Sequence, residues 1–323
     1  MITYNGRNGR TYSLGSKIGS GGEGTVYEVI GSNDLVAKVY PSPATSTQRE
    51  KITTMLNMNF DPYLLDEEGN KVLTVAWPHD LLLDYSGTMC GYVMPKVHTS
   101  HHIFEAARER ERLQLYPRYN KMTPYTIARN LATAVKIMHA HDVVIGDFNQ
   151  NNIMVNEHGY VTLIDCDSFT ITNRNTGKVY KTTVGVAEML PPELQGRDLS
   201  RPSSKFTEQS DNFQLAIHIF ILLMNNTHPF TGEVMNHSQN SSCANPITTN
   251  IAQGMCPAVK GGICPSCCPP FNTLYSPLQR KFIDVFRYDA NDAVKSATIH
   301  KRPTANQWQT VLDMAMRNMK NGS

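Results

Sequence analysis

One apolar stretch, VVIGDFNQNNIMV at residues 143–155, is interrupted by a lone carboxylate and a cluster of amides. Asp147 could accept a proton from a hydroxyl group or orient that hydroxyl for attack. Asn152 could offer its amide oxygen to a hard cation such as Mg²⁺. Taken singly, each residue is more typical of a turn, in which Asp and Asn side chains cap their own backbone. A chemical role therefore depends on what other groups the chain supplies.

A second carboxylate lies at the end of another apolar run. Asp165 follows VTLI, residues 161–164, in a segment that predicts a short buried strand. A carboxylate at such a strand end is suited to a metal ion that carries phosphate. Asp147 would then serve a hydroxyl group, and Asn152 and Asp165 would hold the cation.

The N-terminal part contains a glycine-rich turn, IGSGGEGTVYEV at residues 18–29. Glycine lets backbone N–H groups approach a polyphosphate where a Cβ would clash. This pattern alone is a weak indication of nucleotide binding, because glycine-rich hairpins are common. Further along, Lys38 interrupts the apolar strand VAKVY, where it could neutralise phosphate oxygens or, on an edge strand, reach water. A buried lysine needs an acidic partner, and Glu50 on the following helix is the candidate.

The elements that would position these groups change character near Val97. The first hundred residues predict mostly antiparallel strands with one helix, and the remainder predicts helices with short strands around Asp147. Residues 11–40 are predicted to contain three strands. Further strands are predicted at 71–76, 89–94, 143–145, 153–156 and 160–164. Predicted helices are 47–58, 103–115, 123–141 (with Thr123 as N-cap), 212–224 (apolar all round), 277–288 and 304–317, and residues 166–190 are predicted to be a long loop.

Composition limits the class of protein. The 323 residues include 40% hydrophobic and 18% charged residues with a net charge of +2, so we expect no broad basic surface for nucleic acid. No apolar run approaches the roughly 20 residues of a membrane helix, so we expect no membrane partner. The seven cysteines are an odd number, and single cysteines in apolar surroundings favour a cytoplasmic location.

The order of these motifs resembles that of the Hanks-type (eukaryotic-like) protein kinases, most closely a divergent bacterial and phage branch. The resemblance covers residues 10–317. It implies an α+β, bilobal kinase-like fold, with a small β-rich N-lobe at 1–97 and a larger, mainly helical C-lobe at 98–317. A Cys-rich insertion would occupy 243–272, and 318–323 would form a tail.

Three later motifs extend the resemblance. LPPEL contains Glu193, which matches the glutamate that closes the activation segment, and KRPTANQW contains Arg302, which matches its arginine partner. Asp211, in SDNFQLAIHIF, matches the aspartate that holds the catalytic loop backbone. MPKV resembles the hinge, where the Pro95 carbonyl and the Val97 N–H would bind adenine.

The resemblance implies ATP with Mg²⁺ or Mn²⁺ as cofactors. Lys38 would hold the α- and β-phosphates, and Glu50 would orient it. Asn152 and Asp165 would hold the metal, and Asp147 would orient the attacking hydroxyl. The nucleotide is further expected at Ile18, Gly19, Ser20, Gly21, Gly22, Glu23, Gly24, Val26, Ala37, Met94, Pro95, Val97 and Met154.

The chain departs from the family pattern at three positions. Gly146 replaces the arginine before the catalytic aspartate, so control should not run through the usual arginine–phosphate pair. Asn149 replaces a lysine that contacts the transferring phosphate. The negative charge of the transition state must therefore be neutralised by another group, or the rate is low. Asp167 replaces a flexible glycine, and a loop-capping role is favoured over a carboxylate near the metal.

Three functions are consistent with the sequence. The first is a protein kinase that acts on Ser/Thr of a protein substrate or of itself. The second is a small-molecule kinase, because I-G-D-x-x-x-x-N also resembles the motif of antibiotic and choline kinases, which however lack the P-P-E segment. The third is a nucleotide-binding pseudokinase or scaffold, which the three departures keep open.

The segment 243–272 is rich in cysteine and proline, and C-x-x-C is a metal-ligand spacing. A zinc site is possible there but is not predicted, since a proline-stiffened loop with free or oxidised thiols explains the same residues. Its position after the central helix is compatible with docking of a partner. The potential ligands are Cys256, Cys264, Cys267 and Cys268, with Cys243, His228 or His237 as substitutes.

Overall fold

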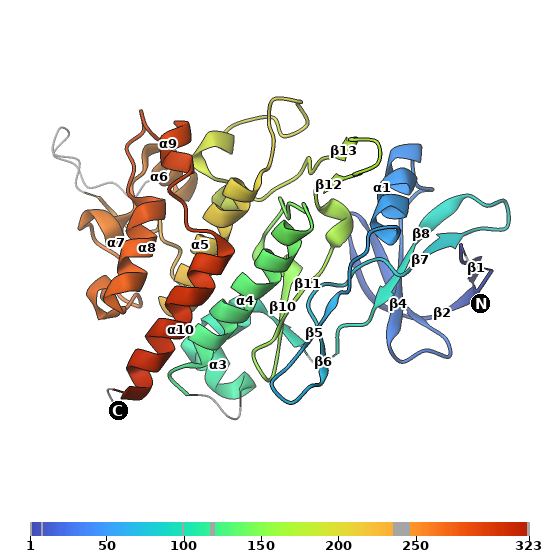
Figure 1. Cartoon of the computed structure of the whole chain (residues 1–323), viewed down its shortest axis with the longest axis horizontal. Helices are drawn as coiled ribbons and strands as arrows, with labels where there is room; N and C mark the ends of the chain where they lie inside the picture. The colour runs from blue at the N-terminus through green and yellow to red at the C-terminus, as the bar shows by residue number, and fades with distance from the viewer. Residues whose placement is uncertain (1, 8, 99, 117–119, 235–245, 322–323) are drawn as a thin grey trace. The chain divides into compact units, whose positions relative to one another are not determined.

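The computed structural model describes residues 2–7, 9–98, 100–116, 120–234 and 246–321 (Figure 1). The chain divides into two compact units. The first comprises Met1–Thr99 with Thr162–Tyr180, and the second comprises Ser100–Val161 with Lys181–Ser323. Segment 162–180, which the sequence analysis assigned to the larger lobe, thus belongs to the N-terminal unit.

The first unit is built on an antiparallel sheet that closes on itself in the order β1-β2-β3-β4-β8-β7. Its interior is a cluster of aliphatic and aromatic side chains that includes Leu14, Ala37 and Val93. Alternation of β-branched and aromatic residues with polar ones explains these strands, because each strand has one face toward this core. The strands are β1 (Thr3–Asn5), β2 (Thr11–Gly21), β3 (Gly24–Val29), β4 (Leu35–Val39), β7 (Asp80–Leu83) and β8 (Met89–Pro95).

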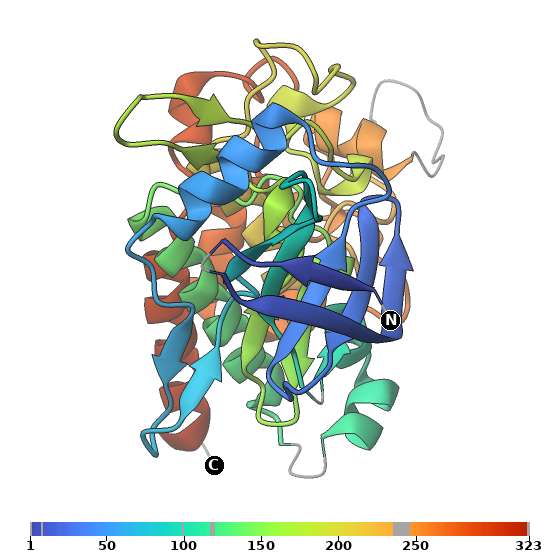
Figure 2. The same ribbon diagram turned by 90° about the vertical axis from the view of Figure 1, so that its right-hand side faces the viewer.

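One helix, α1 (Ser46–Leu56), packs in this unit (Figure 2). A capping box starts it, in which the Thr45 hydroxyl accepts from the Gln48 N–H and the Gln48 side chain accepts from the Thr45 N–H. Its buried residues are Lys51, Ile52 and Met55, and the Trp77 indole donates to the Met55 carbonyl at 3.1 Å. The rotation of α1 about its axis is therefore fixed by burial of one face.

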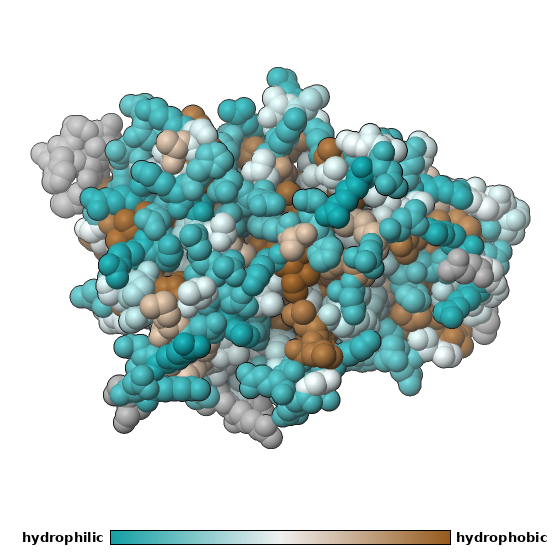
Figure 3. All heavy atoms as spheres, in the orientation of Figure 1, coloured by the Kyte–Doolittle hydropathy of each residue, from teal (hydrophilic) through white to brown (hydrophobic). Residues whose placement is uncertain are grey.

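The rest of the first unit contains two hairpins. β5 (Tyr63–Leu65) pairs with β6 (Lys71–Leu73), and Leu64 and Leu65 of this hairpin are exposed. Figure 3 shows hydrophobic surface in the region of this hairpin. β12 (Ile171–Thr172) pairs with β13 (Val179–Tyr180) beside α1. The prediction of a long loop at 166–190 was therefore wrong for part of the segment, because backbone pairing forms this hairpin within it. Strand 160–164 is shorter than predicted, as β11 (Val161–Leu163), and Leu163 bridges to Val75.

The second unit is mainly helical around α5 (Glu208–Leu223), whose buried face includes Phe213 and Phe220. Phe282, Phe286 and Trp308 pack in the same aromatic core. β9 (Ser100–His102) and β10 (Ile153–Asn156) form an antiparallel pair. The other helices are α2 (Ile103–Ala107), α3 (Glu109–Leu115), α4 (Thr123–Ala140), α6 (Ile247–Gln253), α7 (Pro257–Lys260), α8 (Ser276–Phe286), α9 (Ser296–Ile299) and α10 (Ala305–Asn321).

Several predicted elements of the second unit need correction. Helix 103–115 is two helices, because Arg108 has an extended backbone with ψ 123°. The buried helix predicted at 212–224 begins at Glu208, where a Thr207–Ser210 capping box starts it. The N-cap of α4 is Met122 rather than Thr123, although Pro124 lies in the first turn as predicted.

Segment 143–145 is not one of the strands. Part of its backbone is bound by side chains of α5, as described below. Within segment 243–272, the described part carries the short helices α6 and α7, while Cys243 lies outside the described residues. No helix in the described ranges has the length and apolar character needed to cross a membrane.

Gly91 of β8 lies directly against β4, and a Cβ at this position would overlap the carbonyl oxygen of Lys38. We expect Gly91→Ala to force β4 and β8 apart and to lower the free energy of unfolding by roughly 2–3 kcal/mol. Urea unfolding would measure the change. Gly15→Ala is the matched control, because a Cβ on Gly15 of β2 would make only ordinary contacts at 3.4 Å. Equal stability of the two variants would contradict this account of β4 packing.

Candidate active site

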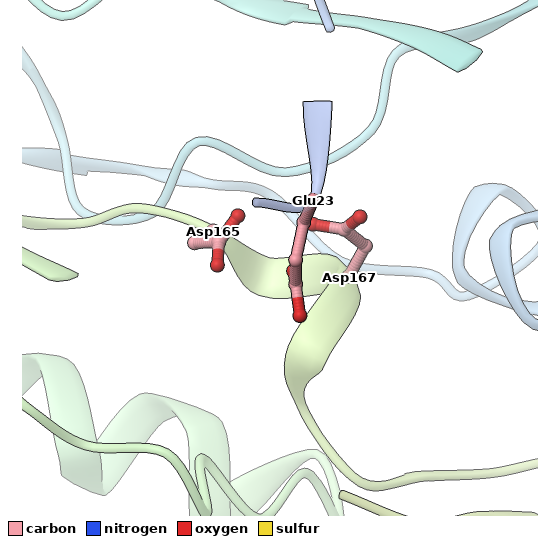
Figure 4. A group of neighbouring side chains, drawn as sticks. All are labelled: Glu23, Asp165 and Asp167. Carbon is pink, nitrogen blue, oxygen red and sulfur yellow. The ribbon is translucent and has the colours of Figure 1, made fainter. Parts of the chain in front are cut away.

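Lys38 lies in an interior strand, because β4 pairs with β3 on one side and with β8 on the other. Its side chain is only 6% exposed, so it is not an edge-strand lysine that reaches water. The amine donates to Asp165 Oδ1 and, at 2.7 Å, to Asp167 Oδ1. Glu23 Oε2 lies 3.6 Å from the same nitrogen. Figure 4 shows these carboxylates, which come from two separate parts of the sequence.

Electrostatics keep this lysine charged. Burial alone would lower the pKa of Lys38, but the negative charges of Asp167 and Asp165 outweigh it and raise the pKa. Burial and the neighbouring Asp165 raise the pKa of Glu23, and the positive charge of Lys38 partly offsets this rise. The cluster thus presents a fixed ammonium group close to the glycine-rich turn.

The predicted ion pair between Lys38 and Glu50 is wrong for this structure. The Glu50 carboxylate accepts from the Lys178 amine and from the Tyr180 hydroxyl at 3.3 Å. The register of α1 explains this, since Lys51 is on the buried face whereas Glu50 is on the exposed one. Lys51 donates to the Asp167 carbonyl oxygen at 2.6 Å, and burial lowers the pKa of Lys51 to about 8.

Asp165 has a left-handed backbone, with φ 62° and ψ 39°. This conformation costs energy for residues other than glycine and is often found where the backbone serves function. The short turn Cys166–Ser168 stabilises it, because the Ser168 hydroxyl donates to the Asp165 carbonyl at 2.9 Å. The Cys166 thiol donates to the Ala76 carbonyl at 3.0 Å. The surrounding contacts therefore hold Asp165 in place.

The glycine-rich turn connects β2 and β3 as predicted. Gly19, Gly21 and Gly22 have open space where a Cβ would be, so their backbone is accessible to a ligand. A Cβ on Gly24 would lie 2.6 Å from the Val39 carbonyl, so a glycine is needed for close packing there. The remaining predicted nucleotide positions of this unit lie at Ile18 and Ser20 (β2), Val26 (β3), Ala37 (β4), Met94 and Pro95 (β8) and Val97 just beyond.

Asp147 and Asn152 belong to the second unit, as does Met154 in β10. The Asn149 amide donates to Asp147 Oδ2 at 3.0 Å, and the Asn152 amide donates to the Asp147 carbonyl at 3.1 Å. Asn149 Oδ1 also accepts from the Asn151 N–H at 2.9 Å. The amide cluster therefore orients Asp147 and shapes its loop. Use of the Asn152 nitrogen in this way is compatible with a cation at its amide oxygen.

Asp211 of α5 holds the backbone before Asp147, as the resemblance implied. Its carboxylate accepts from the N–H of Ile145 at 2.8 Å and from the N–H of Gly146 at 3.0 Å. The His139 Nε2 lies 3.0 Å from the same carboxylate. Asp211 is fully buried, so these bonds offset its desolvation.

Two further residues of α5 hold this loop, and the sequence analysis missed them. Gln214 accepts from the Phe148 N–H at 3.1 Å and donates to the Gly146 carbonyl at 3.0 Å. His218 Nε2 lies 2.9 Å from the Phe148 carbonyl. Asp211, Gln214 and His218 are spaced at i, i+3 and i+7, which places them on one helical face. That spacing within an otherwise apolar helix could have identified them.

Gly146 occupies the position of the missing arginine. Its φ of 73° favours glycine, and a Cβ would lie 2.5 Å from the Thr182 hydroxyl oxygen. Thr182 is only 2% exposed. The space beside Gly146 is thus filled by a threonine.

Glu193 and Arg302 form the predicted ion pair. Two guanidinium nitrogens donate to the two carboxylate oxygens, each at 2.7 Å. Arg302 also donates to the Gln209 carbonyl at 2.9 Å and stacks over the Phe213 ring at 5.1 Å. This bidentate, buried arrangement ties the turn at Pro192–Leu194 to the start of α5.

The cysteines of segment 243–272 do not gather as a metal site among the described residues. There, the group of metal-capable side chains is Glu23, Asp165 and Asp167, around Lys38. The Cys256 thiol is buried and donates to the Pro229 carbonyl at 3.1 Å, and burial raises its pKa to about 12. His228 Nε2 lies 3.1 Å from the Glu188 carbonyl. Cys243 and His237 lie outside the described residues.

We expect Gly146→Ala to cost more stability than Gly196→Ala. Both glycines have a positive φ, but a Cβ on Gly196 would meet open space, whereas one on Gly146 would overlap Thr182. Gly196→Ala should cost about 1 kcal/mol and Gly146→Ala roughly 2–4 kcal/mol, measured by urea unfolding. Similar values for both would show that Thr182 does not constrain the loop.

We expect His218 to make stability dependent on pH. Burial lowers the pKa of His218 to about 4, while the unfolded chain titrates near pH 6.5. The unfolded state therefore binds more protons as the pH falls from about 6.5 toward 4, and up to roughly 3 kcal/mol of stability is lost in that window. In His218→Gln, whose side-chain N–H could still reach the Phe148 carbonyl, this part of the pH dependence should disappear. An unchanged slope between pH 7.5 and 5 would contradict the assignment.

Comparison with known proteins identifies the family. Residues 90–283 match the model of the protein kinase domain. The chain is 32% identical over 321 residues to protein kinase YegI of Escherichia coli (strain K12), a match that covers 97% of this chain and 46% of that protein. Protein kinase YegI of Escherichia coli O157:H7 is 33% identical over 313 residues, with the same coverage. The chain thus spans about half the length of these curated relatives. It belongs to the Hanks-type protein kinase family and has its α+β fold.

Proposed function

We propose that this chain is an ATP-dependent protein kinase that transfers the γ-phosphate to serine or threonine hydroxyls, including its own. The observation that carries the proposal is the buried, charged Lys38 beside a glycine-rich turn and the strand-end Asp165. A cation held in this way is suited to the phosphate oxygens of a nucleotide. The open backbone of the turn would add N–H donors to the same phosphates.

A divalent cation, Mg²⁺ or Mn²⁺, would be held by Asp165 and Asn152. Carboxylate and amide oxygens are the donors that such hard cations prefer, so each residue, taken by itself, is a suitable ligand. When bound, the ion neutralises charge on the phosphates. Asp165 is the more strongly supported ligand, because its carboxylate is partly exposed and its backbone is held in a strained conformation.

The transfer step itself would be assigned to Asp147. The acceptor hydroxyl oxygen forms a bond to the γ-phosphorus while the bond to the β,γ-bridging oxygen breaks and ADP leaves. The hydroxyl proton passes to the Asp147 carboxylate and then to solvent. Asn149, which replaces the usual lysine, donates a neutral hydrogen bond to Asp147 and would orient the base rather than neutralise phosphate.

A protein acceptor is favoured over a small molecule by the Glu193–Arg302 ion pair. This pair anchors the segment that corresponds to the substrate-binding region in protein kinases, which small-molecule kinases of similar catalytic sequence lack. The chain's own hydroxyls are the first acceptor to examine.

The test is incubation of the purified chain with Mg²⁺ and γ-labelled ATP, followed by mass spectrometry. We expect label on serine or threonine in the wild type and none in Asp165→Ala. Asp147→Asn should bind ATP with nearly unchanged affinity but transfer phosphate roughly 10²–10⁴-fold more slowly, because only the base is lost. Omission of the divalent cation should abolish transfer.

Two results would contradict the proposal. Nucleotide binding without any label on the protein or on an added protein acceptor would favour a nucleotide-binding scaffold. Equal labelling of wild type and Asp147→Asn would show that Asp147 is not the base.

A further inference from the structure

Asp167 stands where the family has a flexible glycine, and its side chain faces into the first unit. The side chain is 9% exposed. Its Oδ1 accepts from the Lys38 amine at 2.7 Å and from the Tyr92 hydroxyl at 2.9 Å. The loop-capping role favoured from the sequence is not what the structure shows, since the Ser168 hydroxyl, and not Asp167, binds the Asp165 carbonyl.

The groups around Asp167 offer hydrogen-bond donors to its side chain and its backbone. Tyr92 is fully buried, and burial together with the charge of Asp167 raises its pKa, so its hydroxyl remains a donor. Burial and Asp167 likewise raise the pKa of Tyr40, which is also buried. Lys51 donates to the backbone carbonyl of Asp167 at 2.6 Å. Asp167 is therefore fixed through both its side chain and its backbone.

The Glu50 carboxylate accepts hydrogen bonds from Lys178 and Tyr180 of the β12–β13 hairpin and not from Lys38. Moving Glu50 onto the buried face would require α1 to turn by about 100°, one residue along the helix. That turn would remove Lys51 from Asp167 and break the contact of Trp77 with Met55. The contacts of the buried face of α1 therefore oppose a rotation that would bring Glu50 to Lys38.

We propose that Asp167 is the positioning residue for Lys38, in the place that the family gives to the glutamate of this helix. The Asp167 carboxylate is nearly buried and contacts the Lys38 ammonium group directly. It would hold Lys38 in one rotamer ready for phosphate oxygens, while the more exposed Asp165 is left for the metal. This proposal rests on the proposed kinase function.

Oxygen atoms of Glu23, Asp165 and Asp167 all lie within 4.8 Å of one another, a spacing that also suits a metal ion. The Lys38 amine lies within 3.6 Å of all three carboxylates, so a positive charge already faces each of them. We therefore assign Asp167 to the lysine and not to a metal.

The test compares Asp167→Asn with Glu50→Gln, two changes that remove one charge while keeping shape. Initial rates of autophosphorylation at varied ATP would give KM for ATP and kcat, and calorimetry with the non-hydrolysable analogue AMP-PNP would give affinity. Loss of a charge-assisted bond to Lys38 should raise KM for ATP and weaken AMP-PNP binding by roughly tenfold to a hundredfold in Asp167→Asn. Glu50→Gln should change both by less than about twofold.

The pattern of KM and kcat separates positioning from folding. If Asp167 only stabilised the fold, Asp167→Asn would lower kcat through a smaller active fraction and leave KM for ATP unchanged. That result, or a larger loss in Glu50→Gln than in Asp167→Asn, would overturn the proposal.

A double-mutant cycle decides the proposal even if the wild type transfers no phosphate and the kinase function fails. Lys38→Met, Asp167→Asn and the double variant would be compared by urea unfolding, beside the same cycle with Glu50→Gln. We expect the Lys38–Asp167 cycle to show coupling of at least about tenfold in the unfolding equilibrium constant, and the Lys38–Glu50 cycle to show none. The reverse order would refute the assignment of Asp167.

Discussion

The buried positive charge of Lys38 is the constraint on which the first unit depends. An ammonium group that is 6% exposed must be paired, because an isolated buried charge costs several kcal/mol. Its partners come from the turn between β2 and β3 and from residues 165–167, far apart in the sequence. This pairing, together with the contact of Lys51 with Asp167, explains why segment 162–180 belongs to the N-terminal unit. The contacts that attach segment 162–180 to the first unit are thus the same contacts that position Lys38.

In the second unit, hydrogen bonds from side chains of α5 hold the backbone of the loop that contains Asp147. The loop before Asp147 leaves the strand geometry, so its N–H and carbonyl groups need other partners. A single polar face of α5, made by Asp211, Gln214 and His218, supplies them. An apolar residue at any of these positions would leave buried backbone groups without partners, which costs about 1–3 kcal/mol each. The polar face is therefore a requirement of the loop, and the loop in turn fixes Asp147.

Much of this arrangement was predictable from local sequence, and the failures have physical causes. The order of motifs is displayed directly by the sequence, and the resemblance to protein kinases that rests on it implied the Glu193–Arg302 pair and the role of Asp211. The partner of Lys38 depends on the rotation of α1, and Glu50 and Lys51 are adjacent, so a shift of one residue reverses the assignment. The β12–β13 hairpin was missed because two-residue strands have too little alternation to be recognised. The role of Asp167 required knowing that Tyr92 lies opposite Lys38 across two paired strands.

The departures from the family pattern are linked to these contacts rather than scattered. Gly146 makes room for Thr182, Asn149 binds Asp147, and Asp167 binds Lys38, so each altered residue has a defined partner within its own unit. The central claim is that this divergent site works with Asp167 as the anchor of its lysine. A crystal structure of the chain with Mg²⁺ and AMP-PNP would test it most directly. The account predicts the Lys38 amine within about 4 Å of the Asp167 carboxylate and in contact with phosphate oxygens, with Glu50 still bound to Lys178. A Lys38–Glu50 ion pair in that complex, with Asp167 turned away, would contradict it.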